Sequence, residues 1–278
     1  MMAYTIYNIF EKMREKTMQH NCNGVMICHM NATKRLAALL MVGIICVCNL
    51  AAFQFSPLEQ TFAPSGAEST KTYTIVNDSD DSIAIEISVE TRDQDEFGNE
   101  LNSDASAYFS IVPAKVIVKP QSTQIVRVQY RGPRTVTNEL SFRLRATQIE
   151  YSQGKNAQNK GMFNFMYVYS TSLYVNPSKP IARAGVHRVA PVVAEDGTRY
   201  MAVTISNTGN VHQLLLDASL EVSDSAGNAV TLKGNEALPG IDGMNILAKR
   251  VMTKNIPWPD ALAVGEGVGY KASMTYSK

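Results

Sequence analysis

The chain has 278 residues, of which 45% are hydrophobic and 18% charged, and its formal net charge is +1. This is an ordinary globular composition, which argues against a disordered or repetitive chain. Residues 1–52 contain five Lys or Arg and two Glu, so 21 basic and 23 acidic residues remain and the formal charge of the rest is near −2. Such a balance argues against nucleic acid as a partner, because nucleic-acid-binding domains are usually basic.

The first predicted element is a secretory signal. A basic pair, Lys34 and Arg35, is followed by the apolar run Leu36–Phe53, which contains small residues near its end. Cleavage near Ala52 would remove residues 1–52 and release an exported protein. An uncleaved membrane anchor is the alternative, because the run is about as short as a bilayer-spanning helix can be.

All four cysteines precede the expected cleavage point; they are Cys22, Cys28, Cys46 and Cys48. The exported chain would therefore have no disulfide, and its cores alone must stabilise it. The cysteine spacing matches no standard metal site, so we expect neither a metal nor another cofactor. Met1 and Met30 are alternative starts, and Met30 lies closer to the basic pair of the signal.

After residue 53 the sequence predicts an all-β protein. Short alternating or β-branched runs are separated by turns rich in Asn, Asp, Gly and Pro. The predicted strands are Thr70–Val76, Ile83–Thr91, Tyr108–Val112, Lys115–Val118, Thr123–Tyr130, Leu140–Ile149, Gly161–Val175, Met201–Ser206, Leu214–Ser223, Asn228–Leu232, Asn245–Val251 and Gly267–Thr275. Many short strands at this spacing favour antiparallel sandwiches over a parallel α/β sheet.

The segment Pro177–Pro180 is the predicted linker between two domains. Its two prolines stiffen the chain and prevent continued sheet pairing on either side. Seven predicted strands precede the linker and five follow it. We therefore expect an immunoglobulin-like domain over residues 53–176 and a second β-sandwich over residues 177–278, after the extension and signal peptide of residues 1–52.

The strand predicted before the linker is unusually hydrophobic. A polar segment, Ser152–Lys160, leads into Met162–Tyr169, which is apolar on both faces of a strand. Such a strand is unsuited to a water-exposed sheet edge, so we expect it to be available to another polypeptide.

Several stretches, in this order and spacing, resemble the periplasmic chaperones of the chaperone–usher pathway, which build fimbriae. They are Phe55–Pro57, Tyr73–Asn77, Phe109–Pro113, Val118–Pro120, Gln124–Val128, Glu139, Phe142–Leu144, Ile149, Leu173–Pro177 and Ile205–His212. The resemblance covers about residues 53–278. It implies two immunoglobulin-like domains set at an angle, a periplasmic location, and fimbrial subunits and an outer-membrane usher as partners. Self-association of the free chaperone is left open.

The resemblance also implies a strand that is lent to the subunit. Fimbrial subunits lack their own last strand, and the chaperone adds the seventh strand of its first domain to the subunit's open sheet, a standard example of β-strand addition. Counting back from Pro177, the expected donor residues are Phe163, Phe165, Tyr167 and Tyr169, which share one face of the strand. The alternative is that these aromatics face the core of the domain while Met166 and Val168 face outward.

An anchor for the subunit's C-terminal carboxylate is the second implied feature. The best-known branch of the family uses an Arg in the first strand and a Lys near the end of the seventh, positions that hold Thr61 and Ser172 here. Related chaperones outside that branch have an aromatic–Arg–aliphatic triplet in the sixth strand, which Phe142–Leu144 matches. Arg143 is therefore the expected anchor and Arg145, on the same face, the second candidate. A solvated sheet face is the alternative reading of both arginines.

The sequence contains no convincing enzyme motif. His187 and His212 lie far apart without an evident carboxylate partner, and the acidic run Asp93–Glu96 lacks the calcium-loop spacing and is expected to be a solvated loop. The glycine-rich run Gly265–Gly269 is not followed by a helix that could bind phosphate. We therefore expect a non-catalytic chaperone. The alternative is an exported immunoglobulin-like structural or adhesive fimbrial protein, which would lack a seventh strand.

Overall fold

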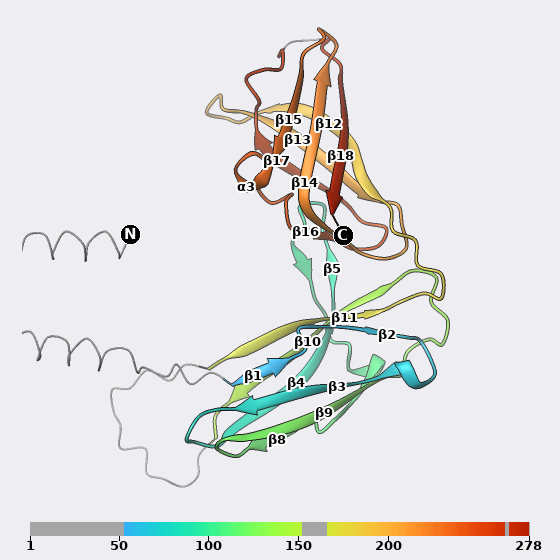
Figure 1. Ribbon diagram of the computed structural model, residues 1–278, viewed down its shortest axis with the longest axis vertical. Helices are drawn as coiled ribbons and strands as arrows, with labels where there is room; N and C mark the ends of the chain where they lie inside the picture. The colour runs from blue at the N-terminus through green and yellow to red at the C-terminus, as the bar shows by residue number, and fades with distance from the viewer. Residues whose placement is uncertain (1–52, 152–165, 265–266, 278) are drawn as a thin grey trace, which may run out of the picture. The chain divides into compact units, whose positions relative to one another are not determined.

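The computed structural model describes residues 53–151, 166–264 and 267–277 (Figure 1). The expected signal, the alternative starts and all four cysteines lie outside these residues. Residues from Ala51 onward form one compact unit, which contains two β-sandwiches. Within the described ranges, no helix is both long and apolar enough to cross a membrane.

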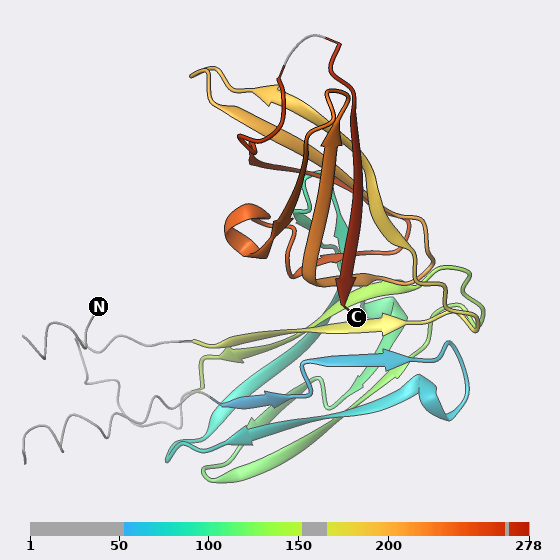
Figure 2. The same cartoon turned by 45° about the horizontal axis from the view of Figure 1, so that its top comes forward.

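The first sandwich packs a four-stranded sheet against a five-stranded sheet (Figure 1, Figure 2). In spatial order, the four-stranded sheet contains β1 (Gln54–Ser56), β3 (Thr70–Asn77), β9 (Ser122–Tyr130) and β7 (Phe109–Val112). The five-stranded sheet contains β2 (Glu59–Phe62), β11 (Val168–Val175), β10 (Leu140–Ile149), β4 (Ile83–Thr91) and β8 (Lys115–Val118). Pairing within both sheets is antiparallel, except that β2 runs parallel to β11.

Side-chain alternation explains which face of each strand lies in this core. In β10, Phe142, Leu144 and Ala146 are buried between the sheets, whereas Arg143 and Arg145 point to the other face. Tyr73 of β3, fully buried, packs in the same core. The hydrophobic positions of the sequence therefore set which arginines of β10 are available on the outside of the sheet.

Short elements complete this half of the chain. They are the hairpin strands β5 (Asp93–Gln94) and β6 (Glu100–Leu101), and the 3₁₀ turns η1 (Ala67–Ser69) and η2 (Ser106–Tyr108). The acidic run that was expected to be a solvated loop forms β5 and the hairpin turn. Asp95 accepts hydrogen bonds from the backbone of Phe97 and Asn99 at 2.9 and 2.8 Å, and Gln94 is buried.

The second sandwich is built in the same way. One sheet contains β12 (Ala184–Val193), β13 (Arg199–Asn207) and β17 (Val251–Pro257); in the other, β14 (Gln213–Asp224) pairs with β15 (Ala229–Lys233), β16 (Met244–Ile246) and β18 (Tyr270–Ser277). A single helical turn, α3 (Gly234–Ala237), follows β15. Val203, Ile205, Leu215 and Leu220 are fully buried in its core. The predicted fold class, two immunoglobulin-like β-sandwiches, is confirmed.

Most of the predicted strands exist, and the differences have local causes. The predicted strand Asn245–Val251 is two strands, β16 and β17, and between them Lys249 adopts a left-handed φ of 61°, outside the β region. Strand β12 was not predicted; it contains Pro191 and an irregularity between Val186 and Arg188, which interrupt its alternation.

The predicted linker lies between strands of different sandwiches. Strand β11 ends at Val175 and β12 begins at Ala184, so Pro177–Pro180 falls between them. The domain boundaries 53–176 and 177–278 stay a prediction.

Candidate functional site

Strand β11 has an unpaired edge along half of its length. Strand β10 pairs with all of β11, whereas β2 pairs only with Ser172–Val175. Among the residues that the structure describes, Val168–Thr171 therefore have no strand on the side away from β10. An open edge of this kind is a template for another strand.

The backbone groups that point into this open edge can be assigned from the register. The Ser172 N–H donates to the Leu58 carbonyl at 2.9 Å, on the side of β2. Because backbone groups alternate in direction along an antiparallel strand, the even-numbered residues of β11 point to this side. Val168 and Ser170 therefore present their N–H and C=O groups to the open edge.

The side chains at the start of β11, and those of the two residues before it, face the opposite way from the expected one. Val168 is 47% and Met166 58% exposed, whereas Tyr167 and Tyr169 pack against the core of the first sandwich. The Tyr169 ring lies 4.9 Å from the Phe53 ring, and its hydroxyl donates to the Phe53 carbonyl at 2.6 Å. The expectation that Tyr167 and Tyr169 face outward is wrong, because both pack against the core; Phe53 and Phe55 contact the Tyr169 ring. The outward row contains Met166 and Val168, the alternative left open above.

The other two expected donor residues, Phe163 and Phe165, lie outside the described residues, as does the polar segment Ser152–Lys160. Their role stays a prediction.

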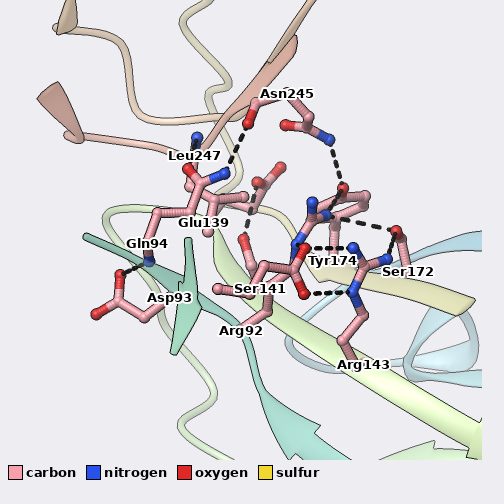
Figure 3. A network of polar contacts seen from close by, with 11 residues as sticks. Arg92, Asp93, Gln94, Glu139, Ser141, Arg143, Ser172, Tyr174, Asn245 and Leu247 are labelled. Carbon is pink, nitrogen blue, oxygen red and sulfur yellow. Dashed lines mark hydrogen bonds and ion pairs between the residues drawn. The ribbon is translucent and has the colours of Figure 1, made fainter. Parts of the chain in front are cut away.

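A cluster of two arginines and one carboxylate lies on the outer face of the same sheet (Figure 3). The Arg143 guanidinium donates to Glu100 Oε2 at 3.0 Å, through a second nitrogen to Glu100 Oε1, and to Ser172 Oγ at 2.8 Å. Arg92 Nε donates to Glu100 Oε1 at 2.8 Å, and its Nη1 donates to the Tyr174 hydroxyl at 2.8 Å. We call Arg92, Glu100 and Arg143 the arginine cluster.

The cluster has more positive than negative charge. The side chains of Arg92, Arg143 and Glu100 are 6%, 19% and 29% exposed. Partial burial raises the pKa of the Glu100 carboxyl, but the hydrogen bond from Arg143 and the charges of both arginines outweigh it and lower the pKa below its usual value. The single negative charge of Glu100 thus faces the positive charges of both Arg92 and Arg143 in a partly buried cluster.

The register of the sheet brings Arg143 into this cluster and leaves Arg145 out. Arg143 lies opposite Ser172 of β11, the residue to which it donates a hydrogen bond. Arg145, the second candidate, instead contacts Glu90 at 3.3 Å, and its side chain is 39% exposed. The sequence did not single out Arg92 and Glu100 as site residues. Arg92 follows β4 and Glu100 lies in the β5–β6 hairpin, both far from Arg143 along the chain.

Polar contacts connect the cluster to the second half of the chain. The Tyr174 hydroxyl accepts a hydrogen bond from Asn245 Nδ2 at 2.9 Å. Gln94 Nε2 donates to the Asn245 carbonyl at 2.7 Å, and the Leu247 N–H donates to Gln94 Oε1 at 2.9 Å (Figure 3). A cavity of about 360 Å³ beside them is lined by Arg92, Glu100, Asn245 and neighbouring residues.

His212 has a carboxylate partner, contrary to the expectation from the sequence. The Glu139 carboxylate is fully buried, and its oxygens lie 2.8 and 2.9 Å from His212 Nδ1. The imidazole stacks on Tyr174 with 3.8 Å between ring centroids. The partner was missed because Glu139 lies 73 residues earlier in the chain. In the described part of the chain no three His, Cys, Asp or Glu side chains are grouped as a metal site would require.

Two sandwiches, with a half-open edge on β11 and an arginine cluster on the same sheet, define a two-domain β-sandwich protein. Residues 61–180 match the family of pili and flagellar-assembly chaperones, specifically the PapD N-terminal domain. Residues 61–180 therefore belong to the pilus-assembly chaperone family, which has a non-enzymatic role.

Solved structures support the same fold. The chaperone in a pre-assembly complex with a tip adhesion subunit, from the archaic chaperone–usher Csu pili of Acinetobacter baumannii, is 14% identical with a TM-score of 0.53, over 76% of this chain and 90% of that one. A structure of a chaperone–tip adhesin complex of CFA/I fimbriae is 12% identical with a TM-score of 0.50, over 80% and 98%. No curated protein sequence matches the chain significantly. At such identities the structural likeness concerns the fold alone.

Proposed function

We propose that this protein is a periplasmic chaperone that holds a fimbrial subunit by adding β11 to the subunit's incomplete sheet, and that it delivers the subunit to an outer-membrane usher. The observation that carries the proposal is the open edge of β11 at Val168–Thr171. The family match supports a periplasmic location, and the two solved structures of similar fold are complexes of a chaperone with a tip adhesin or tip adhesion subunit.

Strand addition would use both the backbone and the outward side chains of β11. Val168 and Ser170 offer hydrogen-bonding groups to an incoming strand, each bond contributing about 0.5–1.5 kcal/mol net. Val168 and Met166 are apolar and exposed, and they would enter the groove that the missing strand leaves in the subunit. Backbone pairing would supply affinity, and this pair of side chains would supply specificity.

Arg143 is the proposed anchor for the C-terminal carboxylate of the subunit. Its guanidinium is partly exposed, and Ser172 and Glu100 fix its orientation. A fixed planar guanidinium can accept a carboxylate through two parallel hydrogen bonds. Arg145 is the weaker candidate, because it belongs to a separate and more exposed pair.

The alternative function, an immunoglobulin-like structural or adhesive subunit, is less well supported. Such a subunit lacks its own last strand. Here β11 is present and pairs with β10 along its whole length. Self-association of the free chaperone through the same open edge remains a separate proposal, which sedimentation of the purified protein tests.

Val168→Asp tests the proposal. In the free protein the new carboxylate would be solvated, but strand addition would bury it in an apolar groove at a cost of several kcal/mol. We expect the variant to lose at least about 100-fold in subunit affinity. The assay is co-expression with the fimbrial subunits of the same genome and affinity purification from the periplasm.

Ile125→Asp is the matched control, since Ile125 is 60% exposed on β9 of the opposite sheet. It should co-purify with subunit as the unaltered protein does. A second pair of variants, Ser170→Pro and Ser170→Ala, tests the backbone, because only proline removes an N–H from the open edge. Equal subunit recovery with Val168→Asp and Ile125→Asp would refute strand addition at this edge.

A further inference from the structure

Glu100 occupies the arginine cluster in the manner of a bound peptide carboxylate. Both oxygens accept hydrogen bonds from Arg143, and one also accepts from Arg92 at 2.8 Å. Charge-assisted hydrogen bonds from guanidinium groups, here from two of them, are what binds a carboxylate strongly. The ligand in that arrangement is a side chain of the protein itself.

When no other carboxylate is bound, Glu100 is needed to neutralise the charges of Arg92 and Arg143. Arg92 is 8% exposed, and a buried guanidinium without a counter-charge is strongly unfavourable. Within the described residues, Glu100 is the only acid in an ion pair with Arg92 or Arg143. An incoming carboxylate could take over this neutralisation, and Glu100 would then be free to enter water.

The geometry allows Glu100 to leave by side-chain rotation. The hairpin that carries it is fixed, since Gln94 bonds Asn245 and Leu247 and the Thr253 N–H donates to the Glu96 carbonyl at 2.8 Å. The Glu100 side chain is 29% exposed, and Glu100 borders the cavity of about 360 Å³. Exchange of carboxylates thus needs no movement of the hairpin backbone.

We propose that Glu100 is an internal carboxylate that fills the Arg92–Arg143 site in the free protein, and that the C-terminal carboxylate of a bound polypeptide displaces it. This regulation rests on the proposed function, because it concerns the anchor of the same subunit. It adds Arg92 as the second cation of the anchor. Glu100 would then compete with every incoming carboxylate. Molecules that do not also pair with β11 would therefore bind weakly.

The test uses N-acetylvaline, which resembles a peptide C-terminus, and N-acetylvalinamide, which lacks the charge. Each is titrated at constant ionic strength against the mature chain with ¹⁵N-labelled arginine, and the Nε–H resonances of Arg92 and Arg143 are followed by NMR. In Glu100→Ala, N-acetylvaline should shift both resonances saturably. In the unaltered protein the apparent dissociation constant should be at least about 10-fold weaker, because the site is then open for a tenth of the time or less.

Glu90→Ala is the matched control, because it frees the single guanidinium of Arg145 on the same sheet; no saturable shift is expected there. Glu100→Gln replaces Glu100→Ala if circular dichroism shows that the alanine variant is unfolded. The proposal is overturned if the Glu100 variant does not respond, if the unaltered protein responds equally well, or if the amide acts like the acid. If strand addition at Val168 proved wrong, these resonance shifts would still be expected. The experiment therefore tests the exchange of carboxylates independently of strand addition.

Discussion

Gln94 is the residue through which the hairpin and the second half of the chain should depend on each other for stability. Gln94 is 7% exposed, and its side-chain amide both donates to the Asn245 carbonyl and accepts from the Leu247 N–H, at 2.7 and 2.9 Å. Gln94→Ala removes both hydrogen bonds without adding a charge. The two backbone groups of the second sandwich would then have no protein partner.

The expected loss follows from these two groups. A buried polar group without a partner costs about 1–3 kcal/mol. The hydrogen bond of the Leu247 N–H is buried, whereas that of the Asn245 carbonyl is only partly buried and Asn245 lines the cavity. We therefore expect Gln94→Ala to lower the free energy of unfolding by about 2–4 kcal/mol.

Guanidinium unfolding of the mature chain with two probes measures this loss. Trp258 is the only tryptophan of the protein and packs against the core of the second sandwich, so its fluorescence reports on that half. Far-UV circular dichroism reports on both sandwiches. In Gln94→Ala the fluorescence transition should move to lower denaturant and separate from the circular dichroism transition.

Gln124→Ala is the control, because the Gln124 side chain makes only an exposed hydrogen bond, at 2.8 Å to the neighbouring Ile125 carbonyl. It should change the free energy of unfolding by less than about 0.5 kcal/mol. If Gln94→Ala and Gln124→Ala unfold alike with coincident transitions, the reasoning about Gln94 is refuted.

Two further changes test local structure. Hydrogen bonds from the Asn228 side chain and the Ala263 N–H lower the pKa of Asp224 to about 2. Asp224 therefore adds stability above its unfolded pKa of about 3.9, and this stability is lost as the pH falls toward 2. In Asp224→Asn that part of the acid dependence should be absent, as thermal melts from pH 5 to pH 2 will show; an unchanged dependence would exclude Asp224 as a source. Gly209→Ala would place its Cβ 2.3 Å from the Ile181 carbonyl oxygen, a backbone atom that cannot rotate away. We expect a loss of about 1–3 kcal/mol in the free energy of unfolding, and an unaltered unfolding midpoint would show that the backbone adapts.

The sequence alone determined the fold class and most of the strands. In β4, β8 and β10 the predicted bounds are those of the structure, because alternation of apolar and polar residues, interrupted by turn residues, is a local property. Arg143 could also be singled out before the structure, as part of a triplet that resembles a family.

Only the tertiary structure decided which face of β11 is outward and what surrounds Arg143. Tyr169 faces inward because Phe53, more than a hundred residues earlier, packs on it, and both faces of this strand are apolar in sequence. Arg92, Glu100 and Arg143 meet because the end of β4, the hairpin and β10 come together, and Glu139 pairs with His212 across 73 residues. Such contacts depend on register and packing between distant segments, which no local pattern encodes.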